Sequence, residues 1–154
     1  MTVKTLYLMR HGEIRFNQLH RIQGASDSPL TAAGIKQAQQ ARAFIQGVTF
    51  DHAYSSTQER ASDTLEIVTA GQMPYQRLKG LKEYDFGVFE GQSEQLNPKI
   101  VGIFSFARLY FDAVKILGQG FKNLSTLIFT FDTDTQTFTY QQVLTLASLP
   151  SSAD

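Results

Sequence analysis

The sequence predicts an α/β fold whose sheet has mixed parallel and antiparallel edges. Two observations predict it. Strand and helix patterns alternate through the first half of the chain, and two strand patterns flank a polar turn near its end. A length of 154 residues favours one domain, which we place over residues 1–147, followed by a small polar tail at residues 148–154.

The first strand is predicted at the start of the chain. Val3 and the apolar residues 6–9 form a run that is too short for a helix of ordinary length. The run ends abruptly in Arg10, His11 and Gly12. Ligands bind at the carboxyl edge of open α/β sheets, so the sequence places a charged side chain and an imidazole where a ligand is expected.

Two helices are predicted next, with a strand between them. Residues 31–46 read as a helix capped by Thr31, residues 50–55 as the strand, and residues 57–70 as the second helix. Apolar residues at helical spacing support both helices: Ile35, Ala38 and Ile45 in the first, and Ala61, Leu65 and Val68 in the second. Residues 127–131 and 138–142 then alternate as strands around residues 132–136, which predicts a terminal hairpin.

Composition excludes several classes of protein. Fourteen basic residues balance fourteen acidic ones, so no nucleic-acid partner is expected. The chain has no cysteine, which removes disulfides, thiol catalysis and thiolate metal sites. The first apolar run is too short for a signal peptide, and the longest apolar stretch, residues 100–107, is far shorter than a membrane span. We expect a soluble cytoplasmic protein.

Five sequence blocks follow one another between residues 6 and 91. They are residues 6–13; Asn17 with Gln23-Gly24; Asp27, Pro29-Leu30-Thr31, Gly34 and Gln37-Ala38; Tyr54-Ser55-Ser56, Arg60-Ala61 and Thr64; and Leu81, Glu83, Phe86-Gly87 and Phe89-Glu90-Gly91. In this order the blocks resemble the histidine phosphatase superfamily, which includes the cofactor-dependent phosphoglycerate mutases. The resemblance implies a three-layer sandwich, with a mostly parallel central sheet flanked by helices and the hairpin at a mixed edge.

The resemblance also implies roles for individual residues. His11 corresponds to the nucleophile that accepts the phosphate, Arg60 to the second phosphate-binding arginine, and Glu83 to the acid/base glutamate. Phosphoryl transfer needs a nucleophile, positive charge around the phosphate oxygens and an acid for the leaving oxygen. His11 fits the first role only as a neutral imidazole, which Arg10 and Arg60 favour if they lie near it. Both arginines are expected to clamp the phosphate.

Other residues of these blocks are expected to contact the substrate. Asn17 offers an amide donor, and Gln23 with Gly24 can approach the substrate from a loop. Glu83 must stay protonated in order to donate, which the charge of a bound phosphate favours. Simpler roles stay open: Asn17 as a turn residue, and Glu83 as an exposed carboxylate.

No metal or cofactor is expected, because the two arginines supply the positive charge. His11, Glu13 and His20 do not have the spacing of a metal site. His20 and His52 fall where the family pattern has no histidine, so they are expected to be surface polar residues.

The pattern departs from the family after Gly91. The family has a second histidine late in the chain, but the only histidines here are His11, His20 and His52. The nearest match, residues 103–107, puts Phe106 in the place of that histidine. Only fourteen residues separate Gly91 from Phe106, where the family has a longer insert that helps to cover the pocket. We therefore expect an open site, and phosphoglycerate mutase activity itself is not expected.

Three hypotheses follow from these features. The first is a minimal phosphatase that hydrolyses small phosphomonoesters through a phosphohistidine at His11, slowed about 10²–10³-fold by the missing donor. The second is a non-catalytic protein that keeps the phosphate cradle. The third is a chain damaged by deletion, with a loosely packed core. The expected partner is a small phosphorylated metabolite, with no nucleic acid and no membrane, and the protein is expected to be a monomer or a homodimer.

Overall fold

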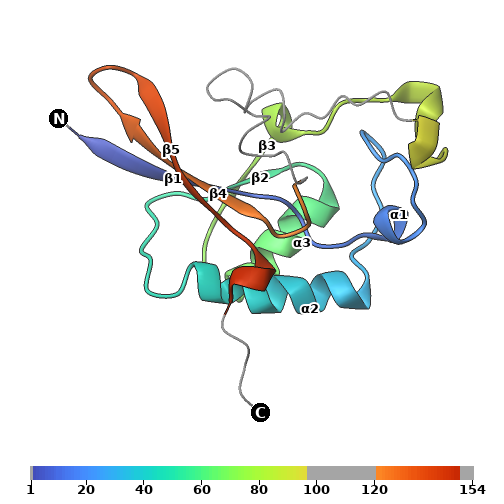
Figure 1. The fold of residues 1–154 in the computed structure, drawn as a ribbon, viewed down its shortest axis with the longest axis horizontal. Coiled ribbons are helices and arrows are strands. Elements are labelled where there is room, and N and C mark those ends of the chain that lie inside the picture. The colour runs from blue at the N-terminus through green and yellow to red at the C-terminus, as the bar shows by residue number, and fades with distance from the viewer. Residues whose placement is uncertain (1, 97–120, 150–154) are drawn as a thin grey trace, which may run out of the picture.

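A computed structural model describes residues 2–96 and 121–149 of the chain (Figure 1). In that part, three long strands form one sheet, two short strands form another, and two helices, α2 and α3, pack against each other. Phe106 and the rest of the segment at residues 103–107, the nearest match to the family's second-histidine segment, lie outside the described residues. The α/β class is confirmed.

The larger sheet is antiparallel. Its strands are β1 (Val3–Met9), β4 (Thr126–Asp132) and β5 (Thr137–Leu144), in the order β1-β4-β5. The first four residues of β4 are all buried, as expected for a central strand, whereas burial alternates along the first half of β5 at the edge. The predicted terminal hairpin is confirmed. At its turn, the Asp132 carboxylate accepts hydrogen bonds from the backbone N–H groups of Asp134 and Thr135.

The smaller sheet contains the one parallel pairing among the described strands, between β2 (Tyr54–Ser56) and β3 (Gln76–Leu78). The prediction of a mostly parallel central sheet is therefore not confirmed over residues 2–96 and 121–149. The reason is the direction of β4. The first residue of β4, Thr126, pairs with the last residue of β1, Met9, and the Arg10 N–H donates to the Ser125 carbonyl at 3.1 Å just beyond this pair. The two strands therefore run in opposite directions.

Helix α2 (Ala32–Ala41) begins where the sequence predicts. The Gly34 N–H donates to the Thr31 hydroxyl at 3.0 Å, so Thr31 is the N-cap. The helix ends earlier than predicted and continues as a 3₁₀ helix, Arg42–Phe44. Its buried face consists of Gly34, Ala38 and Ala41. Ile35, one of the apolar residues at helical spacing, is 40% exposed and does not belong to this buried face. Ile35 directly follows Gly34, and successive side chains in a helix point about 100° apart.

Helix α3 (Glu59–Val68) buries polar residues. Arg60, Ser62 and Thr64 are buried together with Val68, whereas the predicted apolar positions Ala61 and Leu65 are only partly buried. The helix therefore presents a polar face to the loops beside His11. The remaining elements are short: α1 (Arg15–Gln18) and 3₁₀ helices at Lys79–Leu81, Gly87–Phe89, Glu94–Leu96 and Leu146–Ser148.

The core forms between the helices and the larger sheet. Its buried residues are Ala38, Ala41, Phe44, Val68 and Leu124. Small alanines on α2 let that helix approach α3 closely, because Ala38 and Ala41 are completely buried. This packing holds the start of α2 beside the loop that follows β1.

Replacing Gly34 by alanine should destabilise the fold at that contact. A Cβ at Gly34 would lie 2.0 Å from the carbonyl oxygen of Glu13, which is a backbone atom. Overpacking of this kind costs about 1–3 kcal/mol, so we expect a loss of that size in urea unfolding. Gly80→Ala is the matched control, because a Cβ at Gly80 meets nothing within 4 Å. Equal unfolding midpoints for the two variants would contradict the expectation.

Candidate active site

The loop after β1 is held on both sides. The Gly12 N–H donates to the Thr64 hydroxyl of α3 at 3.0 Å. On the other side, a Cβ at Gly12 would lie only 2.8 Å from the Gly34 carbonyl of α2. Glycine at position 12 therefore lets the backbone pass between the two helices. This anchoring fixes His11, the residue just before it.

The imidazole of His11 has a defined tautomer. Its Nδ1 lies 2.7 Å from the carbonyl oxygen of Gly12. A carbonyl only accepts, so Nδ1 carries the hydrogen and Nε2 of the neutral ring keeps its lone pair. Burial lowers the pKa of His11 to about 4, and the positive charges of Arg10 and Arg60 act in the same direction. The lowered pKa favours the neutral imidazole expected from the sequence, with burial as its largest cause.

Asn17 and Asn123 support the same loop. Nδ2 of Asn123 donates to the His11 carbonyl at 3.1 Å and to Oδ1 of Asn17 at 3.2 Å. Oδ1 of Asn17 also accepts from the Ile14 N–H at 3.3 Å. Because its oxygen is engaged, Asn17 has its amide nitrogen to offer to a ligand. The role of Asn123 was missed from the sequence, since 112 residues separate it from His11.

Arg10 lies close enough to Glu83 and Arg60 for their charges to affect its pKa. Burial lowers the pKa of its guanidinium, the negative charges of Glu83 and Glu94 raise it, and Arg60 lowers it. Nη1 of Arg10 donates to the carbonyl of Phe121. The fold therefore brings Arg10, Arg60 and Glu83 into one region, although they lie far apart in the sequence.

Arg60 has a structural role that the sequence did not reveal. Its side chain is 3% exposed and its guanidinium is held by the loop at residues 24–27. Nη2 donates to the Gly24 carbonyl at 3.0 Å, while Nη1 donates to the Ser26 carbonyl at 2.8 Å and to the Asp27 carboxylate at 3.1 Å. Its predicted phosphate contact stays a prediction, and a phosphate would have to share Arg60 with these acceptors.

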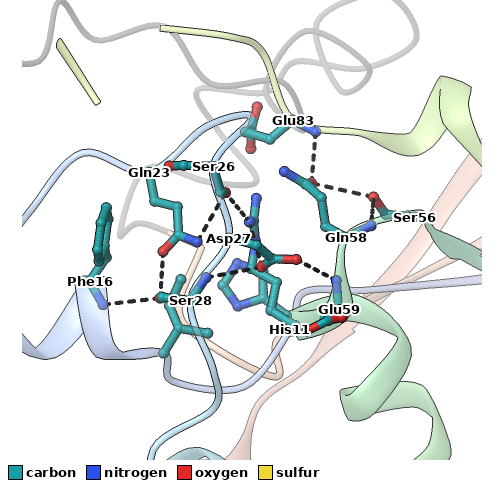
Figure 2. Close-up of polar contacts among 12 residues, drawn as sticks. His11, Phe16, Gln23, Ser26, Asp27, Ser28, Ser56, Gln58, Glu59 and Glu83 are labelled. Atoms are coloured by element: carbon teal, nitrogen blue, oxygen red, sulfur yellow. Dashed lines mark hydrogen bonds and ion pairs between the residues drawn. The ribbon is translucent and has the colours of Figure 1, made fainter. Parts of the chain in front are cut away.

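The predicted substrate residues Gln23 and Gly24 belong to the same loop. The Gln23 side chain donates to the Ser26 carbonyl at 3.1 Å and accepts from the Ser28 hydroxyl at 2.8 Å (Figure 2). The Gly24 carbonyl accepts from Arg60 and from Nε2 of Gln58. The contacts seen for these two residues are internal to the protein, so their predicted contact with the substrate also stays a prediction.

Gln58 is a further residue that the sequence did not single out. Its side chain is buried and lies between β2, the loop at residues 24–25 and Glu83. Figure 2 shows its amide oxygen accepting from the Glu83 N–H at 3.2 Å and from the Ser56 hydroxyl at 3.3 Å. The sequence held no local signal for this role, because the burial of Gln58 is seen only in the structure, where buried polar groups are usually hydrogen-bonded.

Glu83 is partly buried, and its Oε1 accepts from the Tyr84 N–H at 3.0 Å. Its segment crosses the loop at residues 24–26 at close range: a Cβ at Gly24 would lie 2.2 Å from the Tyr84 carbonyl oxygen. Glu83 thus sits on a segment that packs directly on the loop holding Arg60.

Glu90 fastens that segment to the loop. Oε1 accepts from the N–H groups of Ala25 at 2.7 Å and Phe86 at 3.1 Å, and Oε2 accepts from the Ser26 N–H at 2.8 Å. Burial by itself would raise the pKa of Glu90, but the hydrogen bonds from Ser26, Ala25 and Phe86 outweigh burial and lower it. The ionised carboxylate is therefore the form that holds the loop.

We expect Glu90→Gln to destabilise the protein at neutral pH by about 1–2 kcal/mol, because an amide cannot accept all three bonds. The folded-state pKa lies below the unfolded one, so this stabilisation is present above the unfolded value and is lost as the pH falls through the folded one. The difference from the native protein, measured by urea unfolding, should shrink in acid. A difference that stays constant from neutral pH into acid would contradict this role.

The other two histidines lie on the surface, as expected. The His20 side chain is 83% exposed, with Nδ1 3.6 Å from a carboxylate oxygen of Glu94, and His52 is exposed beside Tyr54. Within residues 2–96 and 121–149, no three His, Cys, Asp or Glu side chains are grouped to hold a metal ion. In the same ranges, no helix is long and apolar enough to cross a membrane. Two surface hollows, of about 240 and 570 Å³, lie away from His11.

Comparison with known proteins agrees with this geometry. The family model of the histidine phosphatase superfamily (branch 1) matches residues 6–104. The adenosylcobalamin/alpha-ribazole phosphatase of Escherichia coli K12 is 30% identical over 146 residues, which cover 93% of this chain and 72% of that enzyme. The chain belongs to the histidine phosphatase superfamily.

Other members of the superfamily match part of the sequence or the whole fold. A probable phosphoglycerate mutase, GpmB of Proteus mirabilis, is 43% identical over 86 residues, but the match covers only 55% of this chain and 40% of that protein. The putative alpha-ribazole-5'-P phosphatase of E. coli K-12 has the same fold, with a TM-score of 0.76 at 22% identity over 92% of this chain and 97% of that one. Phosphoserine phosphatase of Entamoeba histolytica, solved with 3-phosphoglyceric acid, gives a TM-score of 0.65 at 26% identity over 92% and 96% of the two chains.

Proposed function

We propose that the protein is a phosphomonoester hydrolase that works through a phosphohistidine at His11. The observation that carries the proposal is the state of His11. It is neutral, Nδ1–H points at the Gly12 carbonyl, and Nε2 therefore keeps its lone pair. Membership of a family of phosphatases and mutases supports the same chemistry.

In the proposed reaction, Nε2 of His11 attacks phosphorus and the ester P–O bond breaks. Glu83 gives its proton to the leaving oxygen, so that the products are an alcohol and a phosphohistidine. Water then attacks the phosphohistidine, loses its proton to Glu83 and releases inorganic phosphate. Arg10, Arg60 and the amide of Asn17 stabilise the charge on the phosphate oxygens.

The proposed substrate is a small phosphorylated metabolite. One solved relative carries 3-phosphoglyceric acid, and another is a phosphoserine phosphatase complex with phosphoserine. Phosphoglycerate mutase activity is not proposed, because the segment between Gly91 and Phe106 is only fourteen residues long. The same shortening and the missing second histidine lead us to propose a rate reduced by about 10²–10³-fold.

A non-catalytic phosphate-binding protein is the second candidate. Two observations favour it. The guanidinium of Arg60 is engaged by the loop at residues 24–27, and the other two histidines of the chain, His20 and His52, are exposed, so neither is a buried second histidine. Such a protein would bind inorganic phosphate but form no covalent intermediate.

Trapping the intermediate separates the two candidates. The protein is mixed with 4-nitrophenyl phosphate from pH 5 to 8, and both nitrophenol release and phosphorylation of His11 by mass spectrometry are followed. A phosphorylated His11 together with turnover supports the hydrolase. Phosphate binding in calorimetry without either signal supports the binding protein, and absence of turnover, of phosphorylation and of phosphate binding eliminates both.

A further inference from the structure

We infer that Gln58 is a positioning residue, which holds Glu83 in place for protonation of the leaving group. This inference rests on the proposed function and adds a residue to it. Gln58 is 5% exposed and accepts a hydrogen bond from the Glu83 backbone N–H. Three observations carry the argument: the side chain is free from helix capping, its orientation is fixed, and it meets the loop that holds Arg60.

The side chain of Gln58 is not used to cap its own helix. Gln58 is the N-cap of α3, a position where side chains usually accept a hydrogen bond from the first turn. Here Gln58 makes no such bond. Instead the Asp27 carboxylate accepts from the Glu59 N–H at the start of the helix. The amide of Gln58 is therefore available to join other segments.

The hydrogen bonds of Gln58 fix the direction of its amide. Oε1 accepts from two donors, the Glu83 N–H and the Ser56 hydroxyl. Nε2 donates to two carbonyls, Gly24 at 2.5 Å and Ala25 at 3.4 Å. Rotating the amide by 180° would place the NH₂ group against the Glu83 N–H and the oxygen against two carbonyls. Only one orientation satisfies all four partners.

The same contact couples Glu83 to Arg60. The Gly24 carbonyl accepts from both Gln58 and Arg60, so one loop oxygen joins the two side chains. Holding the Glu83 N–H at 3.2 Å limits where the Cα of Glu83 lies, and hence where its carboxyl group can reach. Gln58 therefore sets the position of the proposed acid relative to the phosphate-binding arginine.

Leaving-group dependence provides the test. Nitrophenolate leaves without a proton, whereas the alcohol of an alkyl phosphate such as 2-glycerophosphate needs one. We expect Gln58→Met, which keeps the volume and removes the four bonds, to lower kcat/KM for 2-glycerophosphate at least about tenfold, because kcat/KM reports only the steps up to departure of the alcohol. For 4-nitrophenyl phosphate, kcat/KM should change less than about threefold. Equal losses on both substrates would overturn the inference, because they would indicate a general disturbance of the site.

Two further variants test whether the effect of Gln58→Met is specific and whether it acts through Glu83. Ser62→Ala is the matched control, because the Ser62 hydroxyl is buried on the same helix but donates to the carbonyls of Gln58 and Glu59 rather than to Glu83 or the loop at residues 24–27. Ser62→Ala should leave the ratio of kcat/KM for 2-glycerophosphate to kcat/KM for 4-nitrophenyl phosphate unchanged. If Gln58 acts through Glu83, then Gln58→Met should add no further loss for 2-glycerophosphate in a Glu83→Gln background. A full additional loss there would overturn the inference.

Hydrogen exchange separates this inference from the proposed function. The Glu83 N–H should exchange at least about tenfold faster in Gln58→Met than in Ser62→Ala, measured by NMR on the native chain and both variants. If the native protein shows no turnover that depends on His11, the proposed function fails, and the exchange rate alone decides whether Gln58 holds Glu83. Unchanged exchange at Glu83 would overturn the inference whatever the activity.

Discussion

Replacing His11 by alanine should lower the release of nitrophenol from 4-nitrophenyl phosphate at least about 10³-fold, since removal of a nucleophile costs at least this much in enzymes with covalent intermediates. The physical reason is that His11 is the proposed nucleophile, held at the end of β1 where the loop is anchored to α2 and α3 through Gly12. The comparison is made with purified native and variant protein at pH 7, under the same substrate concentrations.

His52→Ala is the control, because His52 is exposed and its ring lies beside that of Tyr54. It should leave the rate unchanged. A similar loss in both variants would point to an effect on folding. Unchanged release in His11→Ala would end the phosphohistidine proposal and favour a contaminating phosphatase or the binding protein.

The lowered pKa of His11 adds a pH dependence that needs no substrate. The folded value is about 4 and the ordinary value is 6.5, so the unfolded chain takes up the proton first as the pH falls. The folded state should therefore lose stability between pH 6.5 and about 4, by on the order of 3 kcal/mol in total. His11→Asn should lose less over the same range in urea unfolding, because it has no such proton to bind. Equal losses of stability in the native protein and in His11→Asn would contradict this expectation, because other titrating groups would then account for the pH dependence.

Local sequence patterns were enough to place the parts of the site that depend on neighbouring residues. The apolar run before Arg10, the cap at Thr31 and the hairpin all depend on signals within a few residues, and all three are confirmed. Arg60 was expected in the helix predicted over residues 57–70, and the structure has it in the first turn of α3. These features follow from propensity and capping, which a single sequence carries.

Pairing between segments that are distant in the sequence could not be predicted from local patterns. The antiparallel alignment of β1 with β4 joins residues more than a hundred positions apart, and no local pattern gives the direction of that pairing. The contacts of Arg60 with Gly24 and of Glu90 with Ala25 are also distant in sequence. The prediction of helix α3 rested on the spacing of its apolar residues, whereas its buried face carries the polar residues that hold the site together.

Replacing Arg60 by methionine should destabilise the protein by about 3 kcal/mol, because breaking a buried ion pair leaves its partner groups unpaired. Arg60 is 3% exposed and Asp27 is 29% exposed, so the loss is expected at the lower end of the range for buried pairs. The carbonyls of Gly24 and Ser26 lose a donor in the same variant. Urea unfolding measures the loss, with Arg42→Met as the control, since Arg42 is exposed and donates to one carbonyl.

The same variants separate the two roles of Arg60. Lysine carries the charge but not the planar fork, so Arg60→Lys cannot bond the Gly24, Ser26 and Asp27 oxygens in the observed geometry, and its stability should fall between those of the native protein and Arg60→Met. If Arg60 also binds phosphate, inorganic phosphate should raise the unfolding midpoint of the native protein more than that of either variant. Equal stabilisation of all three by phosphate would mean that Arg60 serves only to hold the loop at residues 24–27, and that the proposed anion site depends on Arg10 and Asn17.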